Sequence, residues 1–314
     1  MVSTKLVSSA LDEALSLFRK GDFLAGQAQT EKLLTQDLDN EDLKYLNRCI
    51  AFWGNRFDEV AYIQDPLKAG EHFVTNWAPF LQYMQKDSSL LEPFIFTFKT
   101  LAFRTAVMFY SKLYRPEIAE QEPFLCRRIG LCFKALGDYE QAVDFLYMAY
   151  HSESDNPKII AELADAFALY GETKRAKVFF RDAFYEGASE IELEYLESHL
   201  ILDLVASVSQ LGYRGNELLE WLPVYGYIDR TLSIKRELKA AEVGKLKQRI
   251  FMLESELRRV SEDEQRVVLP KLINSYLWLM DTYSLPPIDE DKIKEILLKI
   301  KVLNINIYKA LECR

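Results

Sequence analysis

The sequence predicts an all-α fold: a right-handed solenoid of helical hairpins, closed at its C-terminal end by a helical cap or bundle. A repeat of similar residues at one fixed offset supports this fold, and so does the helical spacing of apolar residues elsewhere. The chain of 314 residues has 12 Gly and 10 Pro, which disfavours a β protein with many tight turns. Its hydrophobic fraction of 49% is enough to bury a sizeable core.

The repeat is clearest over residues 123–187, where similar residues recur 34 positions apart, as do Gly137 and Gly171. A glycine at this place can end a first helix in the left-handed conformation. Small residues at other matched positions allow two helices to approach closely. Further pairs at this offset are Ile129 and Leu163, Gly130 and Ala164, Phe133 and Phe167, Ala142 and Ala176, Leu146 and Phe180, and Ala149 and Ala183. The spacing predicts two consecutive helical hairpins, 123–156 and 157–190.

These two hairpins resemble the tetratricopeptide repeat (TPR). The first copy reads Cys126-x2-Ile129-Gly130-x2-Phe133 and then Ala142-x3-Leu146, and the second reads Leu163-Ala164-x2-Phe167 and then Ala176-x3-Phe180. Cys126 and Ile160 stand where the family has Trp, and the closing proline falls late, at Pro157. The resemblance implies a solenoid in which the first helix of each hairpin lines an inner groove.

Weaker copies extend the predicted array over 1–223. Gly21 and Gly54 are expected to end earlier first helices, and a longer helix is expected before Gly212. The helices expected in the flanking parts are Thr4–Lys20, Asn40–Trp53, Pro66–Lys86, Leu90–Leu113 and Glu190–Leu211.

Residues 224–314 have a different character and are predicted to form a long helix, Arg230–Val260, followed by a helical cap of Val267–Tyr283 and Asp289–Leu311. The long helix carries a heptad-like apolar seam: Val243, Leu246, Ile250, Leu253, Leu257 and Val260. Two interpretations are open. The seam packs on the C-terminal neighbours of the same chain, or it forms a zipper with a second copy or a partner.

The sequence contains no motif that indicates catalysis. A glycine-rich phosphate loop, a nucleophile elbow and a zinc-protease helix motif are all missing, and His72, His151 and His199 are far apart. The cysteines, Cys49, Cys126, Cys132 and Cys313, lack metal-site spacing. We therefore expect no enzyme, catalytic residue, metal or cofactor, and keep an unrecognised enzyme as a remote alternative.

Charge and hydropathy restrict the partners. The 48 acidic and 39 basic residues give a net charge of −9, which disfavours nucleic acid as a partner. The most apolar stretch, Pro93–Leu113, is interrupted by Lys99 and Arg104, so we expect no membrane span. The N-terminal segment lacks the apolar run of a signal peptide, so a cytoplasmic location is expected. The aromatic residues Phe94, Phe96, Phe98, Phe103, Phe109 and Tyr110 suit either a core helix or a docking patch.

The TPR resemblance implies a partner-binding groove on the first helices. Its residues would be Lys44, Arg48, Phe52, Phe124, Arg127, Leu131, Lys134, Lys158, Asp165 and Leu169. Basic residues there suit an acidic or C-terminal carboxylate ligand, or else they pair with nearby acids of the chain. The expected function is a non-catalytic scaffold that binds a protein, as a peptide or a partner helix. The alternative is a self-assembling subunit, a homodimer through the C-terminal helices.

Overall fold

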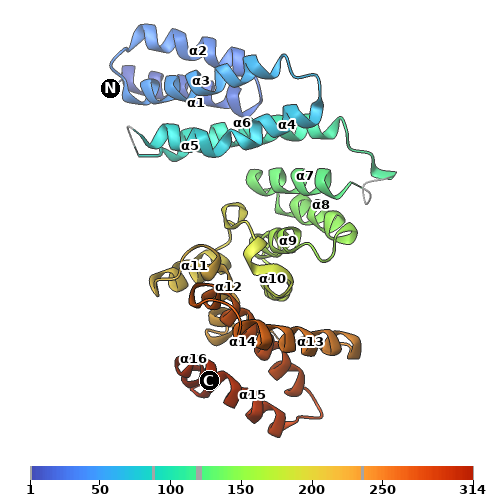
Figure 1. Cartoon of the computed structure of the whole chain (residues 1–314). Helices are drawn as coiled ribbons and strands as arrows, with labels where there is room; N and C mark the ends of the chain where they lie inside the picture. The colour runs from blue at the N-terminus through green and yellow to red at the C-terminus, as the bar shows by residue number, and fades with distance from the viewer. Residues whose placement is uncertain (1, 87–88, 118–121, 235–236, 314) are drawn as a thin grey trace. The chain divides into compact units, whose positions relative to one another are not determined.

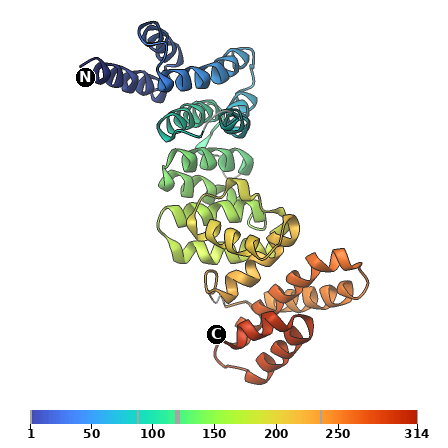
Figure 2. The same cartoon turned by 90° about the vertical axis from the view of Figure 1, so that its left-hand side faces the viewer.

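The computed structural model describes residues 2–86, 89–117, 122–234 and 237–313, and every regular element in these ranges is a helix (Figures 1 and 2). The chain divides into two compact units, Met1–Met148 and Ala149–Arg314. The division falls inside helix α8 (Tyr139–Ser152). The predicted boundary between 223 and 224 lies inside the second unit and within one of its helices.

The first unit begins with two layers of helices, α1–α3 and α4–α6 (Figures 1 and 2). α1 packs on α2 and α6, α4 packs on α6, and α6 packs on α7. The bounds are α1 (Val2–Arg19), α2 (Phe23–Gln36), α3 (Glu41–Val60), α4 (Pro66–Thr75), α5 (Trp77–Gln85), α6 (Glu92–Ser111) and α7 (Pro123–Leu136), followed by α8.

Aromatic rings fill the core of the first unit. The Trp53 indole is fully buried and its ring centroid lies 5.5 Å from that of Phe80 and 6.2 Å from that of Phe73. Phe73 in turn lies 5.0 Å from Phe57 and 6.2 Å from Phe109. Large rings bury much apolar area per residue, so this core gains its stability mainly from packing.

A close approach fixes α4 against α6. The Tyr110 ring lies directly over Gly70, where an added Cβ would overlap it. The Tyr110 hydroxyl donates to the Glu71 carboxylate at 2.5 Å, and the Arg128 guanidinium pairs with the same carboxylate at 2.9 Å. One glycine and one carboxylate therefore join α4 to both α6 and α7.

Several predicted helix bounds in the first unit are wrong. α3 continues through Gly54 to Val60, so this glycine lies within the helix and does not end it. The single helix expected over 66–86 is two helices that meet at Asn76, since Pro79 has no N–H to donate to a continuing helix. Most of the aromatic run on α6 is core, whereas Phe96 is 55% exposed.

The helices of the two repeats start at the predicted offset. The first helices, α7 and α9 (Pro157–Leu169), start 34 residues apart, and the second helices, α8 and α10 (Thr173–Gly187), do so too. Gly137 and Gly171 follow the first helices with φ of 80° and 92°, the left-handed conformation that glycine favours. Within the first hairpin, a Cβ on Gly130 would lie 2.7 Å from the Leu146 side chain, so α7 and α8 need a small residue there.

The second unit is organised around one long helix, α14 (Glu262–Tyr283), which packs on α12, α13 and α15. In Figure 2 the orange and red helices α13–α16 lie next to one another. The other bounds, after α9 and α10, are η2 (Ala188–Glu190), η3 (Leu193–Tyr195), α11 (His199–Gln210), α12 (Gly215–Ile228), α13 (Ala240–Leu257), α15 (Glu290–Leu303) and α16 (Ile305–Glu312).

Three predicted helices in this unit are shorter than expected. α13 begins at Ala240 rather than at Arg230, which has a positive φ of 62° directly after α12; residues 235–236 lie outside the described residues. α11 begins at His199 rather than at Glu190. The last predicted helix stops at Asn304, whose side chain accepts the backbone N–H groups of two following residues and starts α16.

The apolar seam of α13 is covered within the chain. Leu246, Ile250 and Leu253 are buried in the core that α14 supplies. Val243, Leu257 and Val260 are half-buried against the same core. A homodimer through this seam would require α13 to leave α14.

Candidate functional site

Two of the three predicted groove residues of α3, Arg48 and Phe52, contact α5. Lys44 is exposed and pairs with Glu41 at 2.9 Å. The Arg48 guanidinium lies 5.6 Å from the centroid of the Tyr83 ring on α5. Phe52 is 7% exposed and packs against Phe80 and Tyr83. α5 therefore covers the apolar part of this face, and Phe52 belongs to the core.

The predicted residues of α7 divide between surface and core. Phe124 is 47% exposed, and Arg127 is half-buried beside it. Leu131 and Lys134, one and two turns further along, are 5% and 2% exposed. Only the N-terminal part of this helix therefore offers open surface at the predicted positions.

Two of the three predicted groove residues of α9, Lys158 and Asp165, bond to the segment 188–198. The buried Asp165 carboxylate accepts the backbone N–H groups of Glu197 at 2.9 Å and Ser198 at 2.8 Å. These bonds fix the start of α11 and explain why that helix does not begin at Glu190. Lys158 pairs with Glu192 at 2.6 Å, and Leu169 is half-buried. Lys44 and Lys158 thus follow the alternative interpretation, in which the cations pair with acids of the chain.

An open groove of 530 Å³ lies in the first unit between α2 and α3. Its residues on α3 are not the predicted groove residues Lys44, Arg48 and Phe52. Its lining residues are Phe23, Leu24, Gln27, Asn47, Ile50, Ala51, Gly54, Asn55, Phe57 and Asp58. Sequence reasoning missed it because Gly54 was expected to end the helix that forms its wall.

The lining of this groove combines apolar surface with amide groups. Leu24 is 78% exposed, and the Phe23 and Phe57 rings stack with centroids 4.6 Å apart. A Cβ on Gly54 would lie 3.7 Å from the Phe23 ring, which is an ordinary van der Waals distance. Glycine is therefore not sterically required here, but the lack of a side chain leaves more room in the groove. Asn47 and Asn55 are exposed amides that can both donate and accept hydrogen bonds. Such a lining can hold an apolar side chain and also bond to a peptide backbone.

A second groove, of 310 Å³, lies in the second unit between α13 and α15, with α14 as its floor. Its lining residues are Lys247, Ile250, Phe251, Glu254, Tyr276, Leu279, Tyr283, Lys292, Glu295, Ile296 and Lys299. The sequence held one signal for it: Phe251 is apolar but stands outside the seam of α13, and it is 73% exposed.

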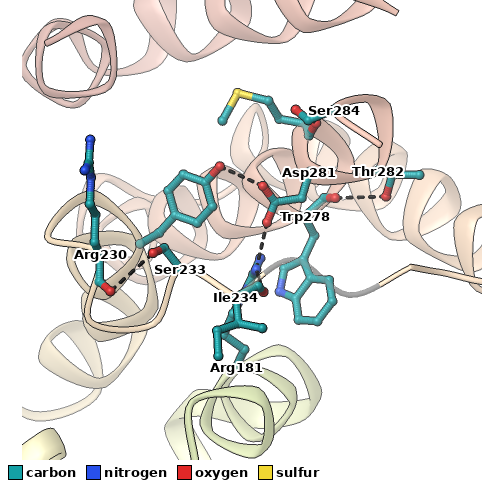
Figure 3. A network of polar contacts seen from close by, with 10 residues as sticks. Arg181, Arg230, Ser233, Ile234, Trp278, Asp281, Thr282 and Ser284 are labelled. Carbon is teal, nitrogen blue, oxygen red and sulfur yellow. Dashed lines mark hydrogen bonds and ion pairs between the residues drawn. The ribbon is translucent and has the colours of Figure 1, made fainter. Parts of the chain in front are cut away.

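A buried polar network joins α10, α12 and α14 (Figure 3). The Arg181 guanidinium donates to the Asp281 carboxylate at 2.7 Å and also to the carbonyl of Ile234. The Tyr227 hydroxyl donates to the other Asp281 oxygen at 2.8 Å, and the Trp278 ring centroid lies 4.4 Å from the guanidinium. Both charged groups are satisfied by the chain itself, so we assign this network to structure and not to chemistry.

The described residues contain no group of His, Cys, Asp and Glu side chains arranged to hold a metal ion. Burial raises the pKa of Cys126 to about 11 and raises the pKa of Cys49 and Cys132 further. These three thiols are therefore protonated and unreactive near neutral pH. Cys313 is exposed near the end of the chain.

None of the described helices has the length and apolar character needed to cross a membrane. Compared with known proteins, the chain matches no protein-family model and no curated protein sequence.

Proposed function

We propose that this chain is a non-catalytic scaffold of TPR-like hairpins, arranged as a right-handed solenoid in the cytoplasm, that binds a partner protein through a peptide or a helix. The equal offsets of the α7–α8 and α9–α10 helix starts support the TPR-like part, together with the left-handed glycine after each first helix. Hairpins of this kind present surfaces between consecutive helices, and such surfaces bind peptides and helices.

The α2–α3 groove is the observation that carries the proposal. At 530 Å³ it has room for several side chains of a bound segment. Exposed Leu24 gives an apolar contact beside the stacked rings of Phe23 and Phe57. The amides of Asn47 and Asn55 supply the hydrogen bonds that an extended backbone needs.

The test fills the groove without disturbing the core. Ala51 lines the groove and is exposed, so Ala51→Trp occupies the space that a peptide would use. Ala28→Trp is the matched control, because Ala28 is exposed on α2 but does not line the groove. The full chain and both variants serve as baits in an affinity capture from the native lysate, followed by mass spectrometry.

A partner retained by the full chain and Ala28→Trp, but lost by Ala51→Trp, is the expected result. Circular dichroism confirms that both variants keep the helical content of the native chain. A set of captured proteins that is the same for all three baits contradicts binding in this groove. Recovery of the bait alone contradicts the proposal that the chain is a scaffold for a partner protein.

A further inference from the structure

The groove between α13 and α15 has a regular construction. α13 and α15 both pack on α14, which presents Tyr276, Leu279 and Tyr283 between them at helical spacing. Each wall contributes four residues at i, i+3, i+4 and i+7, beginning at Lys247 on α13 and at Lys292 on α15. The groove is thus formed by three helices of one unit, within a single core cluster.

Two ammonium groups converge on one aromatic ring of the floor. The Lys247 nitrogen lies 5.8 Å from the Tyr283 ring centroid, and the Lys292 nitrogen lies 5.0 Å from the same centroid. Both side chains are exposed, and Lys247 makes no ion pair with any residue that the structure describes. Lys292 already pairs with Asp289, so Lys247 is the cation near this ring that an anion bound in the groove would neutralise.

The acidic groups nearby are already engaged. The Glu254 carboxylate accepts hydrogen bonds from the Tyr276 hydroxyl and, at 3.3 Å, from Lys299. Burial alone would raise the pKa of Glu254, but these hydrogen bonds outweigh it and lower the pKa below its ordinary value. Asp289 caps α15 and pairs with Lys292 at 2.5 Å. The lining holds three lysines and two carboxylates, and Lys292 and Lys299 are paired with carboxylates of the chain, which leaves Lys247.

The same groove offers apolar contact. Ile250 and Ile296 on the walls and Leu279 on the floor are its buried apolar residues, and they are 6%, 5% and 8% exposed. The Phe251 ring stands at the rim and is 73% exposed. The volume of 310 Å³ is at the low end for ligand sites, which typically measure about 300–1,000 Å³, so it suits one or two side chains of a bound segment.

We propose that the groove between α13 and α15 binds a short acidic segment of a partner protein. A carboxylate of this segment pairs with Lys247 beside the Tyr283 ring, and a neighbouring large apolar side chain packs on Ile250 and Leu279 beside Phe251. The site goes beyond the proposed function, because it lies on other helices, selects another chemistry and does not require TPR-like hairpins.

The experiment selects ligands from a displayed library of random ten-residue peptides, with the full chain as the target. The expected peptides carry at least two Asp or Glu residues within a few positions of an aromatic residue or Leu. Fluorescence polarisation with the labelled best peptide then gives its Kd at low and at physiological salt. Binding should weaken as salt rises, because the charged contacts are exposed and therefore screened.

Two double variants make the result specific to the groove. Lys247→Glu with Lys292→Glu reverses the converging cations and should weaken binding at least tenfold. Lys245→Glu with Lys294→Glu changes the same two helices by the same charge at exposed positions outside the lining, and should keep Kd within about twofold. Phe251→Ala, which changes no charge, should weaken binding about fivefold through lost apolar contact.

Four outcomes would overturn the proposal. Three of them are selected peptides that lack acidic residues, a selection that enriches no peptide, and equal binding of the best peptide by the two double variants. The fourth is displacement of that peptide by inorganic phosphate at micromolar concentration, which would make this a site for small anions. Failure of this site leaves the α2–α3 result unchanged, since the Ala51→Trp experiment uses residues of the other unit.

Discussion

The two units differ in what their cores contain. The first unit packs ring against ring, with Trp53, Phe73 and Phe80 at its centre. The second unit has a more aliphatic core and also buries an ion pair, Arg181–Asp281, whose side chains are 6% and 3% exposed. The hydrophobic effect that favours burial of these rings is not directional, whereas a buried ion pair requires one geometry and is costly when broken. We therefore expect the stability of the first unit to fall most when core volume is removed. The stability of the second unit should fall most when one charge of its buried ion pair is removed.

The largest expected effect comes from Phe73→Ala in the first unit. The variant removes a fully buried ring that contacts Trp53, Phe57 and Phe109, and should lower the free energy of unfolding by about 4 kcal/mol. Hydrogen exchange of the full chain, resolved by peptide, reports each unit separately. In Phe73→Ala, exchange protection should fall in residues of the first unit. Phe73→Leu should lose clearly less protection than Phe73→Ala. Equal losses for the two variants would show that ring volume does not decide stability here.

Asp281→Ala should lower the free energy of unfolding of the second unit by about 3 kcal/mol, because it leaves the Arg181 guanidinium buried without its carboxylate. The double variant Arg181→Met with Asp281→Leu removes both charges and should come within about 1 kcal/mol of the native chain. The same exchange measurement applies, with protection now lost in the second unit. If the double variant is less stable than Asp281→Ala, the unpaired Arg181 charge is not the cause of the stability lost in Asp281→Ala.

Gly137→Ala and Gly171→Ala form a matched pair across the two units. Both glycines have positive φ, and nothing lies within 4 Å of a Cβ added at either position. Each variant should therefore lower the free energy of unfolding by about 1 kcal/mol, through backbone strain alone. Exchange protection of α7 and of α9 measures the two losses. Losses that differ by more than twofold would show that the two hairpins are not equivalent.

The smallest expected effect is on thiol reactivity, and Cys313→Ser should leave the free energy of unfolding unchanged. Of the four cysteines, Cys313 is exposed, whereas burial protects Cys49, Cys126 and Cys132 and raises the pKa of each. Ellman's reagent at pH 8 should thus modify one thiol of the native chain quickly, and Cys313→Ser should abolish this fast phase. All four thiols should react in denaturant. A second fast thiol in the native chain would show that one core opens readily.

Local signals predicted a large part of the fold. The hairpins at 123–190 follow from residues that act on their own segment, such as the glycines that end α7 and α9. The wrong helix bounds have causes that a periodicity does not contain. Asp165 reaches 32 residues along the chain to the N–H of Glu197, and Asn304 stops a helix that its apolar stripe would continue.

The candidate sites were harder to predict, because neighbours distant in sequence decide which helix faces are open. Tyr83 on α5 covers Phe52, and this contact has no signal in the repeat pattern. Lys247 and Lys292 both lie near the Tyr283 ring although 45 residues separate them. A helix pattern gives the face on which a residue lies, and only the packing shows whether another helix covers that face.

The contact between Gly70 and Tyr110 has an evolutionary consequence. Any side chain at residue 70 would occupy the space of the Tyr110 ring, and that tyrosine also holds Glu71, which pairs with Arg128. Substitution at either position alone therefore leaves an overlap or a void. In homologous chains the two positions should covary: a larger residue at 70 should be accompanied by a smaller one at 110, with loss of the acid at 71.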